Sequence, residues 1–130
     1  MIETVQLTFD QPDLAARLAT QSDEAIDGLD FGVIGFDVDG LVRRYNAFES
    51  SCAGLSPQRV VGHDLFNTVA PCMNNFMVAQ RFADAQASGT GLDATIDYVL
   101  TLRMRPVKVR LRLLAEARGA MRYVLVCRKP

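Results

Sequence analysis

The sequence predicts an α+β domain: a five-stranded antiparallel sheet with helices on one face and a short helical cap on the other. Three observations lead to this fold class. Patterns typical of two strands, several short helices, one longer helix and three further strands follow one another along the chain. Apolar and basic residues alternate through 107–115, which indicates a strand with one core face. The 130 residues, 49% of them hydrophobic, suffice for one compact core and leave no room for a second domain.

The first 28 residues are expected to form the cap, and residues 29–130 the core of the same domain. Two short helices are predicted over residues 12–18 and 23–27. Gln21-Ser22 lies between them, where it ends the first helix and caps the second.

The first two strands are expected to form a hairpin. Residues 31–38 have apolar side chains on both faces, and Asp37-Val38-Asp39-Gly40 has the composition of a turn that leads into a second strand over 41–44. Between 45 and 62, Gly54, Pro57 and Gly62 divide the chain into short helical turns of the kind that line pockets.

A longer helix is predicted from about residue 76 to 87. Phe76, Ala79, Phe82 and Ala83 have helical spacing, and Gly89 supplies a stop. Three strands then complete the sheet, over 94–103, 107–115 and 122–128.

Charge is unevenly distributed although the net charge is only -1. Residues 1–30 hold seven acidic side chains against Arg17, whereas nine basic residues follow from Arg103 onward against Glu116 alone. We expect the acidic cap to dock on the basic end of the sheet. The alternative is that the two stretches form solvated faces of opposite sign, since individual surface ion pairs contribute little. Binding to nucleic acid is not expected, because the basic stretch has no interleaved aromatic residues and no recognition helix.

The cysteines and the apolar runs exclude several other classes. Cys52, Cys72 and Cys127 are odd in number and form no CxxC pair, which argues against a disulfide framework and a structural zinc site. No apolar run is long enough to span a membrane, and the N-terminus lacks the features of a secretion signal. We therefore expect a cytoplasmic protein that is a monomer or a weak homodimer.

Cys72 is the candidate reactive residue. Pro71 cannot continue a preceding helix, so Cys72 opens a new segment just upstream of the predicted helix. Free amides at a helix start favour the thiolate, the form that attacks acyl groups. A buried cysteine that only packs as a small apolar residue is the alternative, and the residue alone does not decide between them.

Several motifs carry a resemblance to known families. Residues 55–66, from Leu55-Ser56-Pro57 to Asp64-Leu65-Phe66, resemble the segment that links the short helices of PAS domains. A closer resemblance is to the photoactive yellow protein family, whose members carry p-coumaric acid as a thioester on a cysteine in a Val-Ala-Pro-Cys segment. It is carried by Asp27-Gly28-Leu29-Asp30-Phe31-Gly32, Tyr45-Asn46-Ala47-Phe48-Glu49, Val60-Val61-Gly62, Val69-Ala70-Pro71-Cys72 and Met104-Arg105-Pro106-Val107-Lys108-Val109.

The resemblance implies a blue-light photoreceptor with p-coumaric acid on Cys72, beside Ala70 and Pro71. Tyr45 and Glu49, one helical turn apart, would hold the ligand's phenolate, with Glu49 protonated because an apolar pocket and a neighbouring anion disfavour its charge. After trans–cis isomerisation Glu49 would pass on its proton and remain as a buried carboxylate without an obvious partner. We expect the N-terminal cap to detach, which would relieve the cost of this buried charge. A downstream signalling protein would recognise the surface of the lit state.

Other family positions modify this pocket. Tyr98 matches a pocket aromatic, and Met104 matches a methionine that speeds return to the dark state. Ala53 stands where a threonine usually supports the pocket tyrosine, Leu55 where an arginine usually covers the pocket, and Leu100 where an aromatic is common. These three residues should shift the colour and the cycle.

Two other functions remain open from the residues alone. One is a PAS module that binds a ligand or dimerises without a covalent chromophore. The other is an acyl-transfer enzyme with Cys72 as nucleophile; His63 is the only histidine and is expected at a surface turn, with no third residue to orient it.

Overall fold

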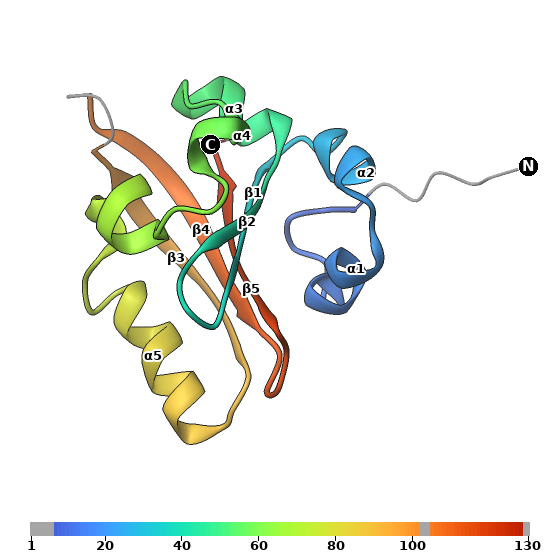
Figure 1. Cartoon of the computed structure of the whole chain (residues 1–130), viewed down its shortest axis with the longest axis vertical. Helices are drawn as coiled ribbons and strands as arrows, with labels where there is room; N and C mark the ends of the chain where they lie inside the picture. The colour runs from blue at the N-terminus through green and yellow to red at the C-terminus, as the bar shows by residue number, and fades with distance from the viewer. Residues whose placement is uncertain (1–6, 102–104, 129–130) are drawn as a thin grey trace, which may run out of the picture.

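A computed structural model describes residues 7–101 and 105–128, and Figure 1 shows a sheet with helices on both sides. The α+β fold class is confirmed. The elements, in chain order, are α1 (Leu14–Thr20), α2 (Asp23–Asp27), β1 (Gly32–Asp37), β2 (Val42–Tyr45), α3 (Ala47–Ala53), α4 (Pro57–Val60), the π-helical η1 (Leu65–Val69), the 3-10 helix η2 (Pro71–Met73), α5 (Ala79–Ser88), β3 (Leu92–Leu100), β4 (Val107–Ala115) and β5 (Met121–Cys127).

The five strands form one antiparallel sheet in the order β2-β1-β5-β4-β3. The predicted hairpin turn joins β1 and β2: the carboxylate of Asp37 accepts from the backbone N–H groups of Asp39 and Leu41, and Gly40 adopts a positive φ of 84°. β3 begins at Leu92, earlier than predicted, because Leu92 pairs with Ala115 across the hairpin with β4. The last part of the strand predicted over 94–103 lies outside the described residues.

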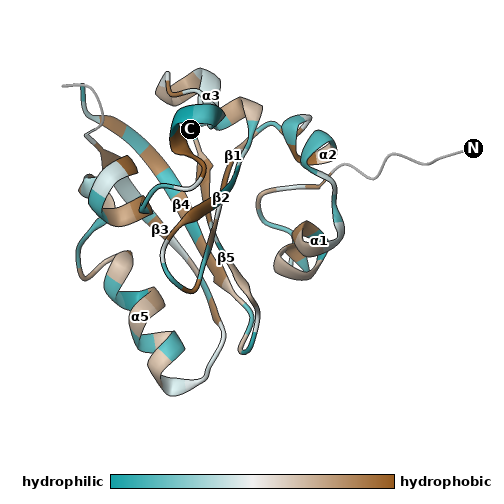
Figure 2. Cartoon of the chain, viewed as in Figure 1, coloured by the Kyte–Doolittle hydropathy of each residue, from teal (hydrophilic) through white to brown (hydrophobic). Residues whose placement is uncertain are grey.

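Alternating side chains of the sheet build two apolar cores. One lies between the sheet and α3 to α5 and is called the core cluster; it includes Ile34, Phe36, Tyr45, Ala70, Phe82, Tyr98, Leu100, Leu111, Val124 and Val126. The other, called the cap cluster, packs Leu7, Phe9, Leu14, Leu18, Ile26 and Leu29 against Phe31, Val33, Leu114, Tyr123 and Leu125. The apolar colouring of the central strands in Figure 2 reflects their burial on both faces.

The cap docks on the sheet through two arginines, in a way that differs from the expected pairing of opposite charges. Arg112, on β4, donates from Nη1 to the carbonyls of Phe9 (2.9 Å) and Gln11 (2.7 Å), while its other nitrogens bind Asp93 of β3. Arg112, from the basic C-terminal part of the chain, thus donates its hydrogen bonds to backbone carbonyls of the cap rather than to carboxylates of the cap.

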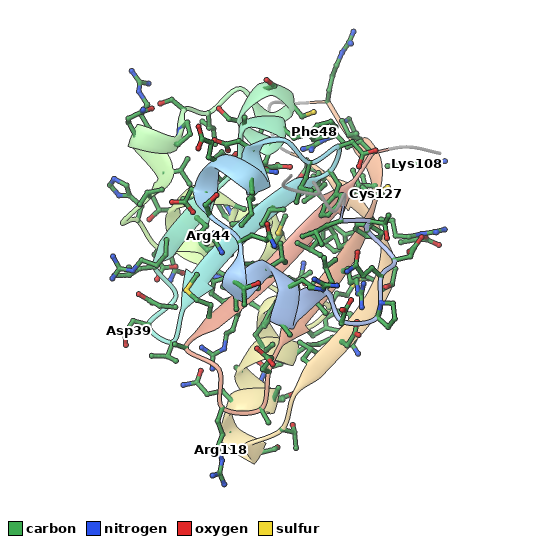
Figure 3. All side chains as sticks on the ribbon, turned by 90° about the vertical axis from the view of Figure 1, so that its right-hand side faces the viewer. Asp39, Arg44, Phe48, Lys108, Arg118 and Cys127 are labelled. Carbon is green, nitrogen blue, oxygen red and sulfur yellow. The ribbon has the colours of Figure 1, made fainter. Side chains whose placement is uncertain are left out.

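Arg44, on β2, provides the second contact. It donates to the carbonyls of Leu18 (2.7 Å) and Gln21 (2.5 Å) and pairs with Asp23 at 2.8 Å. Figure 3 shows Arg44 between its strand and the two cap helices. Because Arg44 lies outside the basic C-terminal stretch, the prediction from charge distribution identified the wrong part of the sequence for this ion pair.

The predicted start of the longer helix at Phe76 is wrong. The side chain of Asn75 accepts from the backbone N–H groups of Met77 (3.0 Å) and Val78 (3.2 Å), which holds this segment as a turn, and α5 begins at Ala79. Phe76 is 79% exposed. The helix ends as predicted, with Gly89 in the left-handed conformation.

Two searches of the described part of the chain found nothing. None of its helices is long and apolar enough to cross a membrane. Nor do its histidines, cysteines and carboxylates form a group of three that could hold a metal ion.

Candidate functional site

The segment that carries Cys72 is built from two short, irregular helices. Asp64 caps the first, η1, by accepting from the backbone N–H groups of Phe66 and Asn67. Pro71 then opens η2, so Cys72 does begin a new segment. The prediction that it lies just upstream of the longer helix is wrong, since Cys72 lies within η2 and α5 begins only at Ala79.

Cys72 is half-buried and packs against the core cluster, where Ala70 is fully buried and Pro71 is exposed. Its thiol is free, as are those of Cys52 and Cys127. Tyr98 donates its hydroxyl to the Cys72 carbonyl, and Asn75 donates to the same carbonyl at 3.2 Å and to the Tyr98 hydroxyl at 2.6 Å. This triangle of hydrogen bonds fixes the backbone beside the thiol to β3.

The polar end of the site lies around the first turn of α3. Asn46 caps this helix by accepting from the backbone N–H of Glu49 at 3.1 Å, and Tyr45 directly precedes it at the end of β2. Both Tyr45 and Glu49 are buried, and Glu49 is 1% exposed. Gly32 of β1 makes room for the carboxylate, since a Cβ there would overlap Glu49 Oε1.

Glu49 is paired with Arg128, immediately after β5. Arg128 Nη1 lies 2.6 Å from Glu49 Oε1, and Nη2 lies 3.0 Å from Oε2, which is a bidentate ion pair. The expectation that a charged Glu49 has no partner is therefore wrong. The pairing depends on strand order, because β5 lies beside β1 and brings Arg128 to the face that Glu49 approaches.

The same two charges act on Tyr45. Burial and the negative charge of Glu49 raise the pKa of the Tyr45 phenol well above its ordinary value, and Arg128 acts in the opposite direction. Tyr45 is thus a neutral hydroxyl, able to donate a hydrogen bond to an anion.

A cavity of about 860 Å³ has on its wall residues that contact the cysteine segment and one member of this charged pair. Asn75 and Tyr98, which hold the Cys72 carbonyl, lie on its wall, and so does Arg128, which holds Glu49. The other lining residues are Met77, Asp97, Val99, Lys108, Val109 and Arg110. Its volume is in the range of pockets for small organic ligands.

The remaining predicted site residues lie in different environments. Ala53 and Leu100 are buried, Leu100 within the core cluster, and Leu55 is partly buried against that cluster. Met104 lies outside the described residues. His63 is exposed in the turn at Gly62, whose φ is 91°, as expected for a surface residue.

The residues fit an aromatic acid that is joined through its acyl group and carries a phenol. A thiol lies at the edge of the apolar core cluster, which also contains Tyr45, and a carboxyl group and a guanidinium lie beside that tyrosine. An uncompensated anion would be costly in such surroundings, and the guanidinium compensates it.

Three polar residues of this site were missed by sequence reasoning: Asn46, Asn75 and Arg128. Asn46 lies in the helix-start pattern Asn46-Ala47-Phe48-Glu49, which a search for caps could have found. Asn75 was assigned to the approach of the longer helix. Arg128 was counted only as part of a basic stretch, and no local pattern pairs it with Glu49.

Comparison with known proteins identifies the family. The chain is 34% identical over 122 residues to the photoactive yellow protein of Rhodothalassium salexigens, which covers 94% of this chain and 97% of the relative. It is 35% identical over 105 residues to that of Halochromatium salexigens, covering 81% of this chain and 83% of the relative. No protein-family model matches the chain.

A solved structure supports the same assignment. The photoactive yellow protein domain of the sensor histidine kinase Ppr from Rhodospirillum centenum matches with a TM-score of 0.78 and 34% identity, covering 85% of this chain and 96% of that one. The PAS domain of the RpfR quorum-sensing receptor from Cronobacter turicensis matches with a TM-score of 0.60 and 14% identity, which shows the fold alone. The chain therefore belongs to the photoactive yellow protein family and is a photoreceptor domain with the PAS fold.

Proposed function

We propose that this chain is a blue-light receptor that carries p-coumaric acid as a thioester on Cys72. The observation that carries the proposal is the position of the free, half-buried Cys72 thiol on the same core cluster as Tyr45, which Glu49 and Arg128 adjoin. The family assignment supports the proposal, because the relatives are photoactive yellow proteins.

Attachment uses Cys72 as a nucleophile. The thiol releases its proton, and the thiolate attacks the carbonyl of an activated p-coumaric ester. The bond from sulfur to the acyl carbon forms, the bond from that carbon to the leaving group breaks, and the leaving group departs with its electron pair and takes up a proton. Tyr98 and Asn75 hold the Cys72 backbone during this step. The proposed product is a lasting thioester on Cys72 rather than an acyl-enzyme that turns over.

The polar residues Tyr45, Glu49 and Arg128 orient the phenol end of the chromophore and balance its charge. When bound, the chromophore supplies light absorption and a double bond that isomerises. Tyr45 donates its hydroxyl to the phenolate, Glu49 donates its proton when it is protonated, and Arg128 supplies the positive charge. Glu49 gives up this proton after illumination and returns to the carboxylate that Arg128 binds.

We further propose that the N-terminal cap detaches as the signal. Asn46 supports a direct route from the site to the cap, because its side chain accepts from the Glu49 and Val33 N–H groups and donates to the carbonyls of Ile26 and Phe31. A second route follows β5, where Arg128 lies next to Cys127, and Cys127 packs against the cap cluster. A downstream protein would bind the sheet face that the cap leaves.

Mass spectrometry after incubation with activated p-coumaric acid tests the attachment. The wild-type chain should gain the mass of one coumaroyl group on the peptide that contains Cys72 and should turn yellow. Cys72→Ala should stay colourless while retaining Cys52 and Cys127 as internal controls. A colourless wild-type protein, or a label distributed over all three thiols, would contradict the proposal and favour a PAS module without a covalent ligand.

A further inference from the structure

We propose that Arg128 is the counter-ion of the chromophore site, which balances one negative charge on either Glu49 or the chromophore phenolate. This inference rests on the function proposed above. It assigns to Arg128 the role of a positioning residue: it determines which of the two acidic groups holds the proton.

The geometry of Arg128 suits a charge shared between two places. Its guanidinium binds both carboxylate oxygens of Glu49, at 2.6 and 3.0 Å, and the same side chain lines the large cavity. The Glu49 side chain is 1% exposed and that of Arg128 is 17% exposed. Water can therefore reach the Arg128 guanidinium from the cavity, whereas the buried Glu49 carboxylate depends on this guanidinium to compensate its negative charge.

The other ionisable groups nearby do not replace Arg128. Arg110 and Lys108 also line the cavity, but Arg110 pairs with Asp97 at 3.5 Å and Lys108 is exposed. Tyr45 and the Cys52 thiol are the other ionisable groups that interact with Arg128, and neither carries a positive charge. Among the residues that the structure describes, Arg128 is the cation bound to Glu49.

Position 55 makes this assignment more specific. The resemblance places a pocket-covering arginine of the family there, and this chain has Leu55, which is partly buried against the core cluster. A leucine contributes no charge on that side of the pocket. Arg128 approaches instead from the end of β5, on the side of Glu49 that faces Gly32.

One cation permits one buried anion. If Glu49 and a phenolate were both charged, the site would hold two anions against Arg128, and burial of the unbalanced charge is costly. A phenolate therefore requires a protonated Glu49, and a charged Glu49 requires a neutral phenol. Proton transfer from Glu49 after illumination moves the negative charge between two positions near the same guanidinium and leaves no charge without a partner.

The unloaded protein provides the first test, by infrared spectroscopy of the carboxyl groups. Wild-type protein should show no band from a protonated Glu49, because Glu49 is paired with Arg128. Arg128→Gln should show a buried protonated-carboxyl band that disappears in Arg128→Gln/Glu49→Gln. Arg110→Gln, which changes a cation on the same cavity, should resemble wild type. A protonated Glu49 band in the wild-type protein would overturn the inference even if no variant folds.

The loaded protein provides the second test, by titration of its colour in the dark. Arg128→Gln should raise the pH at which the yellow phenolate becomes a colourless phenol by about one unit or more, at least a tenfold gain in proton affinity. Arg128→Lys should recover part of this shift and Arg110→Gln none of it. Equal midpoints for Arg128→Gln and wild type would overturn the role of Arg128, whereas a wild-type chain that never turns yellow would overturn the proposed function and leave the infrared result standing.

Discussion

Asn46→Ala should weaken the chain at the junction between the chromophore site and the cap. The Asn46 side chain is 2% exposed and makes four hydrogen bonds: it accepts from Val33 N at 2.9 Å and Glu49 N at 3.1 Å, and donates to the carbonyls of Phe31 at 3.0 Å and Ile26 at 3.1 Å. Alanine removes all four.

The magnitude follows from the groups that lose a partner. The Ile26 carbonyl keeps a second hydrogen bond, from Leu29 N at 3.1 Å, so it is not left without a donor. Val33 N, Glu49 N and the Phe31 carbonyl lose the bonds that Asn46 provides. At about 1 kcal/mol for each of these buried groups, the free energy of unfolding should fall by about 3 kcal/mol. This is a large part of the roughly 5 to 15 kcal/mol of a small domain.

Urea unfolding followed by far-ultraviolet circular dichroism measures this loss, since the chain has no tryptophan to report by fluorescence. The midpoint should move down by roughly 1 to 3 M. Asn74→Ala is the matched control, because Asn74 is exposed and its side chain donates a hydrogen bond to the side chain of Asn67 at 3.2 Å. Its effect on the free energy of unfolding should stay within about 0.5 kcal/mol. Equal midpoints for Asn46→Ala and wild type would refute the hydrogen-bond account.

Three further predictions follow from the fold and the site. Arg112→Met removes the hydrogen bonds to the Phe9 and Gln11 carbonyls and also the pair with Asp93 of β3. The free energy of opening that protects residues 7–28 from hydrogen exchange in the dark should fall by about 2 kcal/mol, and that of the β3–β4 hairpin should fall less, because its backbone ladder remains. Equal changes in both regions would argue against a separate role in holding the cap. Gly32→Ala places a methyl group against Glu49 Oε1, so the ion pair between Glu49 and Arg128 should be lost in the unloaded protein. The variant should unfold at a lower urea concentration than wild type. An unchanged midpoint would show that the carboxylate does not need this space. Folding raises the pKa of Tyr45, so its contribution to the free energy of unfolding should be complete below pH 10.0 and should be lost above it, where unfolded chains release the phenol proton. Tyr45→Phe should therefore show a smaller loss of stability at alkaline pH. Equal alkaline losses in Tyr45→Phe and wild type would contradict the raised pKa.

Local chemistry was enough to predict most of the sheet. The turn at Asp37 to Gly40 was predicted because its side-chain hydrogen bonds and its left-handed glycine depend only on neighbouring residues. The alternation in β4 likewise identified Val109, Leu111 and Leu113 as buried, whereas Val107, which it also assigned to the core face, is 42% exposed. It did not reveal that Arg112, on the opposite face, is 4% exposed, because the cap that covers it comes from the other end of the chain.

Features that depend on contacts between distant residues could not be predicted in this way. Phe76 fitted the helical spacing, yet the side chain of Asn75 holds the preceding turn and leaves Phe76 in solvent. Glu49 and Arg128 are 79 residues apart in sequence, and they meet only because β5 pairs with β1 in the middle of the sheet. The attachment residue Cys72 was proposed from its sequence motif, whereas the cation that accompanies it required the strand order.

The most direct test of the photoreceptor function is the absorption of the loaded chain before, during and after blue light. The account predicts a yellow band that bleaches under illumination and returns fully in the dark, with the coumaroyl mass still on Cys72 at the end. Glu49→Gln should keep the attachment but shift the band, because it removes the proton that Glu49 exchanges. A loaded protein whose absorption does not change in blue light, or whose lost colour is accompanied by loss of the attached mass, would contradict the account.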